Sequence, residues 1–223
     1  MRETFKDLTF DCPAANALAA DAAFWKLYDS SFPSNEREPR SVILESLRNR
    51  VGVVIRARVG GRTVGLAATH LLHSPGIPFL VYLAVSAELR SRHIGSALFE
   101  KAWTTSMERY PERGLRAAGM VWEVDIPERA TSEADLQHSR RRIAFFSRLG
   151  GHILPGRYLQ PPVDGVASVP MHLMFRPAPG RPLPDNTERS ALVRALYLQK
   201  YHEANRISRT VLEDLLRETG TDR

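Results

Sequence analysis

Arg90, Arg92 and Gly95 lie between a short apolar segment and a segment with the spacing of a helix. The apolar segment, residues 78–85, is rich in aromatic and branched side chains and predicts a buried strand. Apolar residues recur at helical spacing from Ile94, so a helix is expected to begin near Arg92. Its first turn would present unpaired backbone N–H groups and a positive dipole end, which suit a pyrophosphate. Arg90 or Arg92 would balance the negative charge.

Two carboxylates are spaced for a different kind of chemistry. Residues 117–125 read as a strand, and because side chains alternate along a strand, Glu123 and Asp125 share a face while Val124 points away. An alkyl ammonium, with a pKa of about 10.4, must lose a proton before its nitrogen can attack, and a carboxylate can take that proton. Glu123 is the first candidate for this base and Asp125 the second. A solvated strand end explains both carboxylates equally well.

Two tyrosines, Tyr82 and Tyr158, are weaker candidates for a hydroxyl in the same site, since most tyrosines are simply packed with their hydroxyl satisfied. Residues 32–39 would shape the side where an acceptor binds, with Glu36 or Glu38 recognising a cationic amine. Asn35 and Glu38 also have the spacing of a helix start, and capping is the favoured explanation for them.

The segment that runs from Arg90 to Leu98, Arg-x-x-His-x-Gly-Ser-Ala-Leu, resembles the acyl-CoA motif of the GNAT-type N-acetyltransferase superfamily. Arg90 and Gly95 match the first and last positions of the family pattern, whereas His93 stands where the family usually has a glycine. That residue must keep φ negative or accept strain. A shifted register that begins at Arg92 restores the glycine but places the motif later in the helix, so the first register is preferred.

The resemblance implies an α/β (α+β) fold with a mixed central sheet of about seven strands, flanked by helices and followed by a C-terminal helical extension. It implies acetyl-CoA, or another short acyl-CoA, as the cofactor. The pantetheine arm would run beside residues 83–85, where a backbone N–H would polarise the thioester carbonyl. The cofactor-binding residues implied are Leu83, Ala84, Val85, Arg90, Ser91, Arg92, His93, Ile94, Gly95, Ser96 and Phe146.

The helix expected over residues 138–149 departs from the family at one position. In many members a tyrosine follows its first aromatic residue and is proposed to protonate the leaving CoA thiolate, but here that residue is Phe146. A thiol with a reference pKa of about 8.5 is still a fair leaving group near neutral pH. The resemblance therefore implies transfer of an acetyl or small acyl group to a primary amine by direct attack on the thioester.

The elements that must position these residues follow one another in the order of the family. A two-residue hairpin is indicated by Gly60-Gly61 between two β-rich segments. The sequence predicts strands over residues 3–10, 51–58, 62–70, 78–85, 117–125, 152–159 and 169–175, and helices over residues 13–31, 41–50 and 138–149 besides the helix near Arg92.

A proline-rich segment divides the chain. Residues 177–186 are predicted as a linker between a GNAT-like acyltransferase domain, residues 1–176, and a C-terminal helical extension, residues 187–223. Thr210 and Glu213 have the spacing of a capping box and predict the start of a last helix. The helices of the extension would cover the domain or a second subunit, which would make a homodimer.

Composition narrows the class of protein. The 223 residues are 43% hydrophobic and 25% charged, enough for a sizeable core. The single cysteine, Cys12, excludes an intramolecular disulfide, and scattered histidines predict no metal site. The sequence shows neither an apolar signal region at its start nor an apolar run of bilayer length, so no membrane association is expected and the cytoplasm is the expected location.

The net charge of +6 suits a polyanionic cofactor or a nucleic acid. The basic block Arg140-Arg141-Arg142 has no interleaved aromatic residues and is typical of a solvated helix face, so the expected partner is a small-molecule or peptide amine rather than nucleic acid. Two alternatives stay open. One is an acyl-CoA-binding regulatory module without turnover, because His93 and Phe146 depart from the pattern. The other is an acetyltransferase that acts on aminoacylated tRNA.

Overall fold

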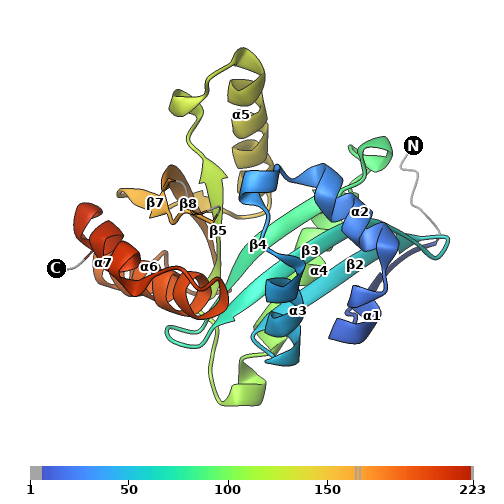
Figure 1. Cartoon of the computed structure of the whole chain (residues 1–223), viewed down its shortest axis with the longest axis horizontal. Coiled ribbons are helices and arrows are strands. Elements are labelled where there is room, and N and C mark those ends of the chain that lie inside the picture. The colour runs from blue at the N-terminus through green and yellow to red at the C-terminus, as the bar shows by residue number, and fades with distance from the viewer. Residues whose placement is uncertain (1–6, 164, 166, 222–223) are drawn as a thin grey trace. The chain divides into compact units, whose positions relative to one another are not determined.

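The computed structural model, drawn in Figure 1, describes residues 7–163, 165 and 167–221. The chain forms two compact units. Unit 1 comprises Met1–Leu71 and Leu80–Leu115, and unit 2 comprises Leu72–Phe79 and Arg116–Arg223. The short segment Leu72–Phe79 is tied into unit 2 by Gln199, whose side chain accepts a hydrogen bond from the His73 N–H at 2.7 Å and donates one to the Ser74 carbonyl at 2.8 Å.

Unit 1 is built on a sheet whose strand order is β1, β2, β3, β4. β1 pairs antiparallel with β2, and β2 pairs antiparallel with β3. The predicted hairpin is confirmed: Gly60 and Gly61 have φ of 55° and 77°, as a two-residue turn between twisted strands requires. The strands are β1 (Leu8–Asp11), β2 (Gly52–Val59), β3 (Arg62–Leu72) and β4 (Ile77–Val85). Part of the strand predicted over residues 3–10 lies outside the described residues.

The helices of unit 1 cover the two faces of its sheet, with α1 to α3 on one face and α4 on the other (Figure 1). They are α1 (Ala15–Ala19), α2 (Ala22–Ser31), η1 (Ser34–Glu36), α3 (Arg40–Arg48), η2 (Ala87–Leu89), α4 (Ile94–Glu108) and η3 (Pro111–Arg113). One buried cluster joins the first three helices to the strands, and its members are Leu18, Phe24, Trp25, Tyr28, Ile43, Val54, Leu66, Ala68, Tyr82 and Ala84.

The single helix predicted over residues 13–31 is wrong, because the chain breaks into α1 and α2 at Asp21. The Asp21 carboxylate accepts a hydrogen bond from the Phe24 N–H at 2.9 Å and so caps α2. It also accepts hydrogen bonds from Arg56 at 2.7 Å and from Thr63 at 3.1 Å. These contacts with β2 and β3 outweigh the weak preference of one aspartate for a helix interior.

In unit 2, β8 lies between β5 on one side and β6 and β7 on the other, and all three pairings are antiparallel. The strands are β5 (Gly119–Asp125), β6 (His152–Ile153), β7 (Tyr158–Gln160) and β8 (Val169–Pro177). The one strand predicted over residues 152–159 is two, because Pro155 lacks an N–H and Gly156 has φ of 95°.

The helical elements of unit 2 are η4 (Pro127–Arg129), α5 (Glu133–Arg148), α6 (Asn186–Ala195), the π-helix η5 (Leu196–Ala204) and α7 (Arg209–Glu218). The helix α5 begins earlier than predicted, since the Ser132 hydroxyl accepts a hydrogen bond from the Asp135 N–H at 3.1 Å and caps it. The helices after the proline-rich segment belong to the same unit as β5 to β8. The linker and the homodimer stay predictions.

A capping box is present in this C-terminal part, but at a different helix from the one predicted. Asp185 and Glu188 exchange hydrogen bonds of 2.8 Å and 3.1 Å between side chain and backbone at the start of α6. The box predicted at Thr210 is wrong. The residue lies inside α7, and Glu213 accepts a hydrogen bond from Arg209 at 2.9 Å, one turn earlier on the same helix.

Asp21→Asn tests whether the charge of Asp21, rather than its cap, stabilises unit 1. Asparagine caps a helix as well as aspartate does, so the substitution removes only the anion that pairs with Arg56. Burial alone would raise the pKa of Asp21, but hydrogen bonds from the Phe24 N–H, Arg56 and Thr63 outweigh it and lower that pKa. A carboxyl with a lowered pKa stabilises the folded state above its unfolded pKa, and this contribution is lost as pH falls through the folded value.

We therefore expect Asp21→Asn to lower the free energy of unfolding at pH 7 by about 1–2 kcal/mol. The difference from the native chain should shrink toward zero below about pH 4. Urea unfolding between pH 2.5 and 7 measures both. Asp29→Asn, which removes an exposed carboxylate paired with Arg37 and Arg40, is the control and should cost less. An Asp21→Asn loss of equal size at every pH contradicts the prediction.

Candidate functional site

The predicted anion site lies in unit 1, in the turn between β4 and α4. The Arg90 Nε donates a hydrogen bond to the Val85 carbonyl at 3.2 Å, which holds the turn against the end of the strand. The helix begins at Ile94, and its N-cap residue, His93, makes no side-chain capping bond. The N–H groups of the first turn of α4 are therefore left without an intrahelical or capping acceptor, as an anion site requires.

Two residues of this turn have a left-handed backbone although neither is glycine. Ser91 and His93 both have φ of 62°, a conformation that costs a residue with a Cβ roughly 1–2 kcal/mol. Residues held in such conformations cluster at ligand sites. A glycine, which the family pattern usually has at this position, would adopt this φ without strain. The register of the motif stays a prediction.

The other predicted cofactor residues differ in exposure. Arg90, Ser91, Arg92 and His93 are exposed, whereas Ile94 is buried in the core of unit 1. Gly95 and Ser96 are half-buried, and so are Leu83 and Val85, on either side of the buried Ala84. At the buried positions only the backbone is available to a ligand. The roles of all these residues toward a cofactor stay predictions.

The carboxylate of Glu123, on β5 in unit 2, accepts three hydrogen bonds from side chains. Its Oε1 accepts from the Tyr158 hydroxyl at 2.5 Å and from the Tyr201 hydroxyl at 2.7 Å. Its Oε2 accepts from the Gln160 Nε2 at 2.7 Å. All three donors favour the ionised carboxylate, which can only accept. The structure therefore brings Glu123 and Tyr158 together, as members of one hydrogen-bonded cluster.

The Tyr158 phenol acts as a donor in this cluster. Burial raises its pKa well above the ordinary value, and the negative charge of Glu123 raises it further. The phenol therefore stays protonated across the pH range in which enzymes work. Its hydrogen goes to Glu123, so the role that the geometry allows for Tyr158 is to hold that carboxylate.

Asp125 and Phe146 lie in other surroundings. Asp125 pairs with Arg142 on α5 at 3.2 Å, and both side chains are partly exposed. Phe146 is buried, with its ring 4.9 Å from that of Trp122 and 5.0 Å from that of Phe145, measured between centroids. Asp125 thus links β5 to α5, and Phe146 contributes to the core of unit 2. Their functional roles stay predictions.

Sequence reasoning missed Gln160 and Tyr201. Gln160 follows Tyr158 by two residues on β7, so strand alternation places both side chains on one face. Tyr201 belongs to the π-helix, 78 residues from Glu123 in the sequence. Tyr197 and Tyr201 are four residues apart, a spacing that places two tyrosine hydroxyls on one face of a helix. Nothing in the sequence connects this face with β5.

The loop over residues 32–39 in unit 1 is held by tyrosines rather than by helix caps. The Tyr82 hydroxyl donates to the Glu36 carbonyl at 3.1 Å and accepts from the Glu38 N–H at 2.8 Å. The Tyr28 hydroxyl donates to the Glu38 carbonyl at 3.0 Å. The N-cap of α3 is Pro39, without a side-chain bond, so the capping predicted for Asn35 and Glu38 is wrong. Tyr82 has the packed role that most tyrosines have.

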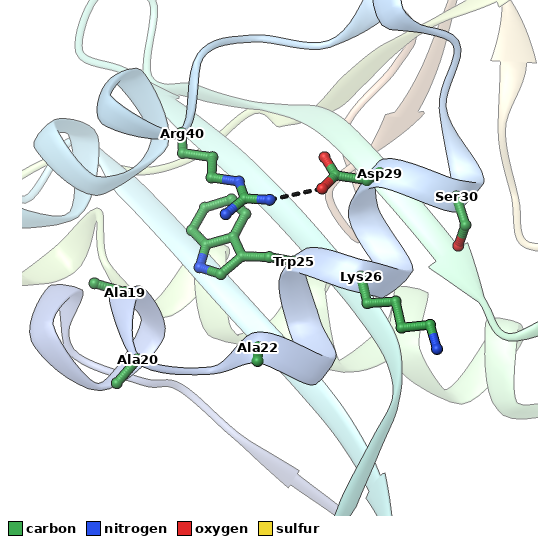
Figure 2. Close-up of a pocket in the computed structure, with 8 residues that line it drawn as sticks. All are labelled: Ala19, Ala20, Ala22, Trp25, Lys26, Asp29, Ser30 and Arg40. Carbon is green, nitrogen blue, oxygen red and sulfur yellow. Dashed lines mark hydrogen bonds and ion pairs between the residues drawn. The ribbon is translucent and has the colours of Figure 1, made fainter.

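An open groove of about 640 Å³ lies over α1, α2 and the start of α3 in unit 1, and Figure 2 shows its lining. The Arg40 guanidinium lies 4.9 Å from the centroid of the Trp25 ring and binds the Asp29 carboxylate at 2.6 Å. The remaining lining residues are Ala19, Ala20, Ala22, Lys26 and Ser30. No predicted site residue lines this groove.

In the part of the chain that the structure describes, no three His, Cys, Asp or Glu side chains gather as metal ligands would. Within those same residues, no helix combines the length and the apolar character that crossing a membrane requires.

The model of the acetyltransferase (GNAT) family matches residues 21–132, half of the chain. The chain therefore belongs to the GNAT family of acetyltransferases, enzymes that use acyl-CoA, and the predicted family is confirmed. No curated protein matches the sequence.

Solved structures share the fold at low sequence identity. A protein of Bacteroides thetaiotaomicron assigned to the GNAT family has a TM-score of 0.65 and 18% identity over 90% of this chain and 99% of its own. Arabidopsis thaliana NAA60, solved with acetyl-CoA, has a TM-score of 0.56 and 14% identity over 78% and 99%. An aminoglycoside 6′-N-acetyltransferase, solved with coenzyme A, has a TM-score of 0.54 and 18% identity over 79% and 99%. The predicted fold class is thereby confirmed, and membership of the acetyltransferase family confirms the predicted acyl-CoA cofactor.

His93→Gly tests whether the turn needs only the left-handed backbone at position 93, and not the imidazole, to bind CoA. Glycine adopts the left-handed conformation freely, so the free energy of unfolding should rise by up to about 1 kcal/mol. Affinity for CoA should be kept or improved, because the N–H groups that would bind phosphate remain in place. Thermal unfolding and titration calorimetry measure the two effects.

His93→Ala is the matched control for the same position. It removes the imidazole but keeps a Cβ, so it should bind CoA as the native chain does without the gain in stability. Calorimetry between about pH 5.5 and 8 brackets the reference histidine pKa of about 6.5. If both variants lose affinity, and lose most at low pH, the cationic imidazole itself contacts phosphate and the backbone explanation is wrong.

Proposed function

We propose that this chain transfers an acetyl or other short acyl group from acyl-CoA to a primary amine, by direct attack of the amine on the thioester. The observation that carries the proposal is the turn before α4. Its backbone at His93 has a φ of 62°, which glycine adopts freely, and α4 starts there without a side-chain cap. A histidine in the glycine position is thus compatible with a phosphate-binding turn.

The pyrophosphate of CoA would bind to the N–H groups of the first turn of α4. Arg90 and Arg92 are exposed beside that turn and would balance the phosphate charge. The pantetheine arm would follow the backbone of residues 83–85, with a backbone N–H of Leu83 or Ala84 directed at the thioester carbonyl.

Glu123 is the proposed carboxylate that serves the attacking amine, by taking its proton directly or through water. Its three hydrogen bonds hold it in one place, which favours it over Asp125, whose partner is Arg142. Tyr158 would act through Glu123. Proton donation to the CoA thiolate has no proposed residue in this chain, because Phe146 carries no hydroxyl.

The proposed acceptor is a small-molecule or peptide amine. One of the similar structures is named as an aminoglycoside acetyltransferase, and such an amine is one member of that class. A cytoplasmic location and a homodimer formed through the C-terminal helices are further parts of the proposal. A regulatory module without turnover is left open because His93 and Phe146 depart from the family pattern. The backbone at His93 has a conformation that glycine would adopt, so Phe146 is the remaining reason for that alternative.

Cofactor binding is tested first by thermal unfolding with CoA and acetyl-CoA. A ligand that binds only the folded state at 100 times its Kd adds about 2.7 kcal/mol, so the Tm should rise by several degrees. Arg90→Glu should weaken CoA binding at least tenfold, whereas Arg181→Glu, in the proline-rich segment, should leave it unchanged. Equal losses in the two variants would show a general effect of net charge, and no Tm shift at saturating CoA would remove the assignment.

Turnover is tested by thiol release from acetyl-CoA with two probe amines, kanamycin and a short peptide with a free alanine N-terminus. Glu123→Gln should lower kcat by about 10²–10⁴-fold, the usual effect of losing a general base, while CoA affinity is kept. Asp125→Asn should lower it much less. Tight CoA binding without release of thiol for either probe would favour the regulatory module, and an active Glu123→Gln variant would exclude Glu123 as the base.

A further inference from the structure

We propose that Tyr201, on the π-helix η5, is a positioning residue of the acceptor site: together with Tyr158 it fixes the Glu123 carboxylate in one orientation and in its ionised form. The functional part of this inference rests on the role proposed for Glu123. Tyr201 lies well beyond residues 21–132, the part of the chain that matches the family model.

The three hydrogen-bond donors to Glu123 lie on β7 and on the π-helix η5, and together they bind both carboxylate oxygens. Tyr158 and Tyr201 donate to the same atom, Oε1, at 2.5 Å and 2.7 Å, and Gln160 donates to Oε2 at 2.7 Å. A carboxylate oxygen offers two lone pairs, so the two phenols occupy those of Oε1. Rotation of the carboxylate would break all three bonds.

The π-helix explains how one helical segment reaches two strands. Its i→i+5 hydrogen bonding redirects the side chains that follow α6, and such segments are rare and frequently lie at functional sites. The Tyr197 hydroxyl donates to the Leu159 carbonyl on β7 at 2.6 Å, while the Tyr201 hydroxyl reaches Glu123 on β5. Both tyrosines are buried, and their ring centroids are 6.4 Å apart. The unusual helix is thus held by two phenols with different acceptors.

Several titratable groups of unit 2 lie near Glu123 in the described part of the chain. Tyr158 and Tyr201 contact it directly, and Tyr197 lies farther off, facing Arg189 and Glu218 as well. Asp125, two residues along β5, pairs with Arg142. Burial raises the pKa of both Tyr158 and Tyr197, so these phenols stay protonated. The cluster thus surrounds the carboxylate with neutral donors that stabilise its negative charge.

A carboxylate held in its ionised form can first pair with an alkyl ammonium and then accept its proton. The acceptor class that fits is an amine that arrives as its cation and pairs with Glu123 before it attacks. Loss of the Tyr201 hydroxyl removes one charge-assisted hydrogen bond from the ionised form, so Glu123 should then take up a proton at higher pH.

The test compares Tyr201→Phe with Tyr197→Phe, which removes an equally buried hydroxyl from the same π-helix without touching Glu123. The titration of the Glu123 carboxyl is followed by ¹³C NMR in the full chain, assigned with Glu123→Gln. We expect the midpoint to rise by roughly one pH unit in Tyr201→Phe, the equivalent of one hydrogen bond to a charged group, and to stay in place in Tyr197→Phe. Thermal unfolding shows that both variants fold.

Kinetics then connect the titration to function. With acetyl-CoA and the probe amines kanamycin and the alanine peptide, the acid limb of kcat/KM should move to higher pH in Tyr201→Phe by the same amount as the NMR midpoint. The KM for acetyl-CoA should stay constant. In a Glu123→Gln background, Tyr201→Phe should have no further effect, as a double-mutant cycle requires of a residue that acts only through Glu123.

The outcomes separate the two proposals. An NMR midpoint that does not move in Tyr201→Phe, or moves equally in Tyr197→Phe, overturns the role of Tyr201 whatever the activity of the enzyme. A midpoint that moves in Tyr201→Phe, together with a Glu123→Gln variant of full activity, leaves the cluster as described and overturns the function proposed for Glu123.

Discussion

A carboxylate that is partly withdrawn from water is stabilised by hydrogen bonds, and in unit 2 the hydrogen bonds of one such carboxylate join segments far apart in the sequence. Glu123 on β5 is satisfied by Tyr158 and Gln160 on β7 and by Tyr201 on the π-helix. The same π-helix holds Leu72–Phe79 through Gln199, so it is bonded both to the strands and to the segment that enters from the middle of the chain. Glu123 is only half-buried, and each of these hydrogen bonds to its charge contributes about 1.5–3 kcal/mol.

Unit 1 meets a different constraint. The turn before α4 contains two left-handed residues with side chains, Ser91 and His93, and this strain is balanced by the packing of the helix that follows. Ile94 and Leu98 are almost completely buried and fix the start of α4 against the sheet. The position of the N–H groups of its first turn thus depends on this packing. In one unit hydrogen bonds set the position of a charge, and in the other burial maintains a strained backbone.

The features that the sequence predicted are those encoded by neighbouring residues. Gly60-Gly61 specifies its hairpin locally, and the change from the apolar strand to the helix at Ile94 is visible in the period of the side chains. The break at Asp21 is not visible, since it depends on Arg56 and Thr63, which lie more than thirty residues away. Tyr201 is an extreme case. Its helix was predicted, but neither its π form nor its contact with Glu123 follows from local spacing.

The two candidate sites also differ in where they lie along the chain. The turn at residues 90–96 falls within the segment that matches the family model, whereas Tyr158, Gln160 and Tyr201 all follow it. Substitutions that accumulate after residue 132 can therefore alter the surroundings of Glu123 without changing a single residue of the turn. Under the function proposed above, descendants of this chain would be free to diverge in the amines they accept while inheriting the same use of acyl-CoA.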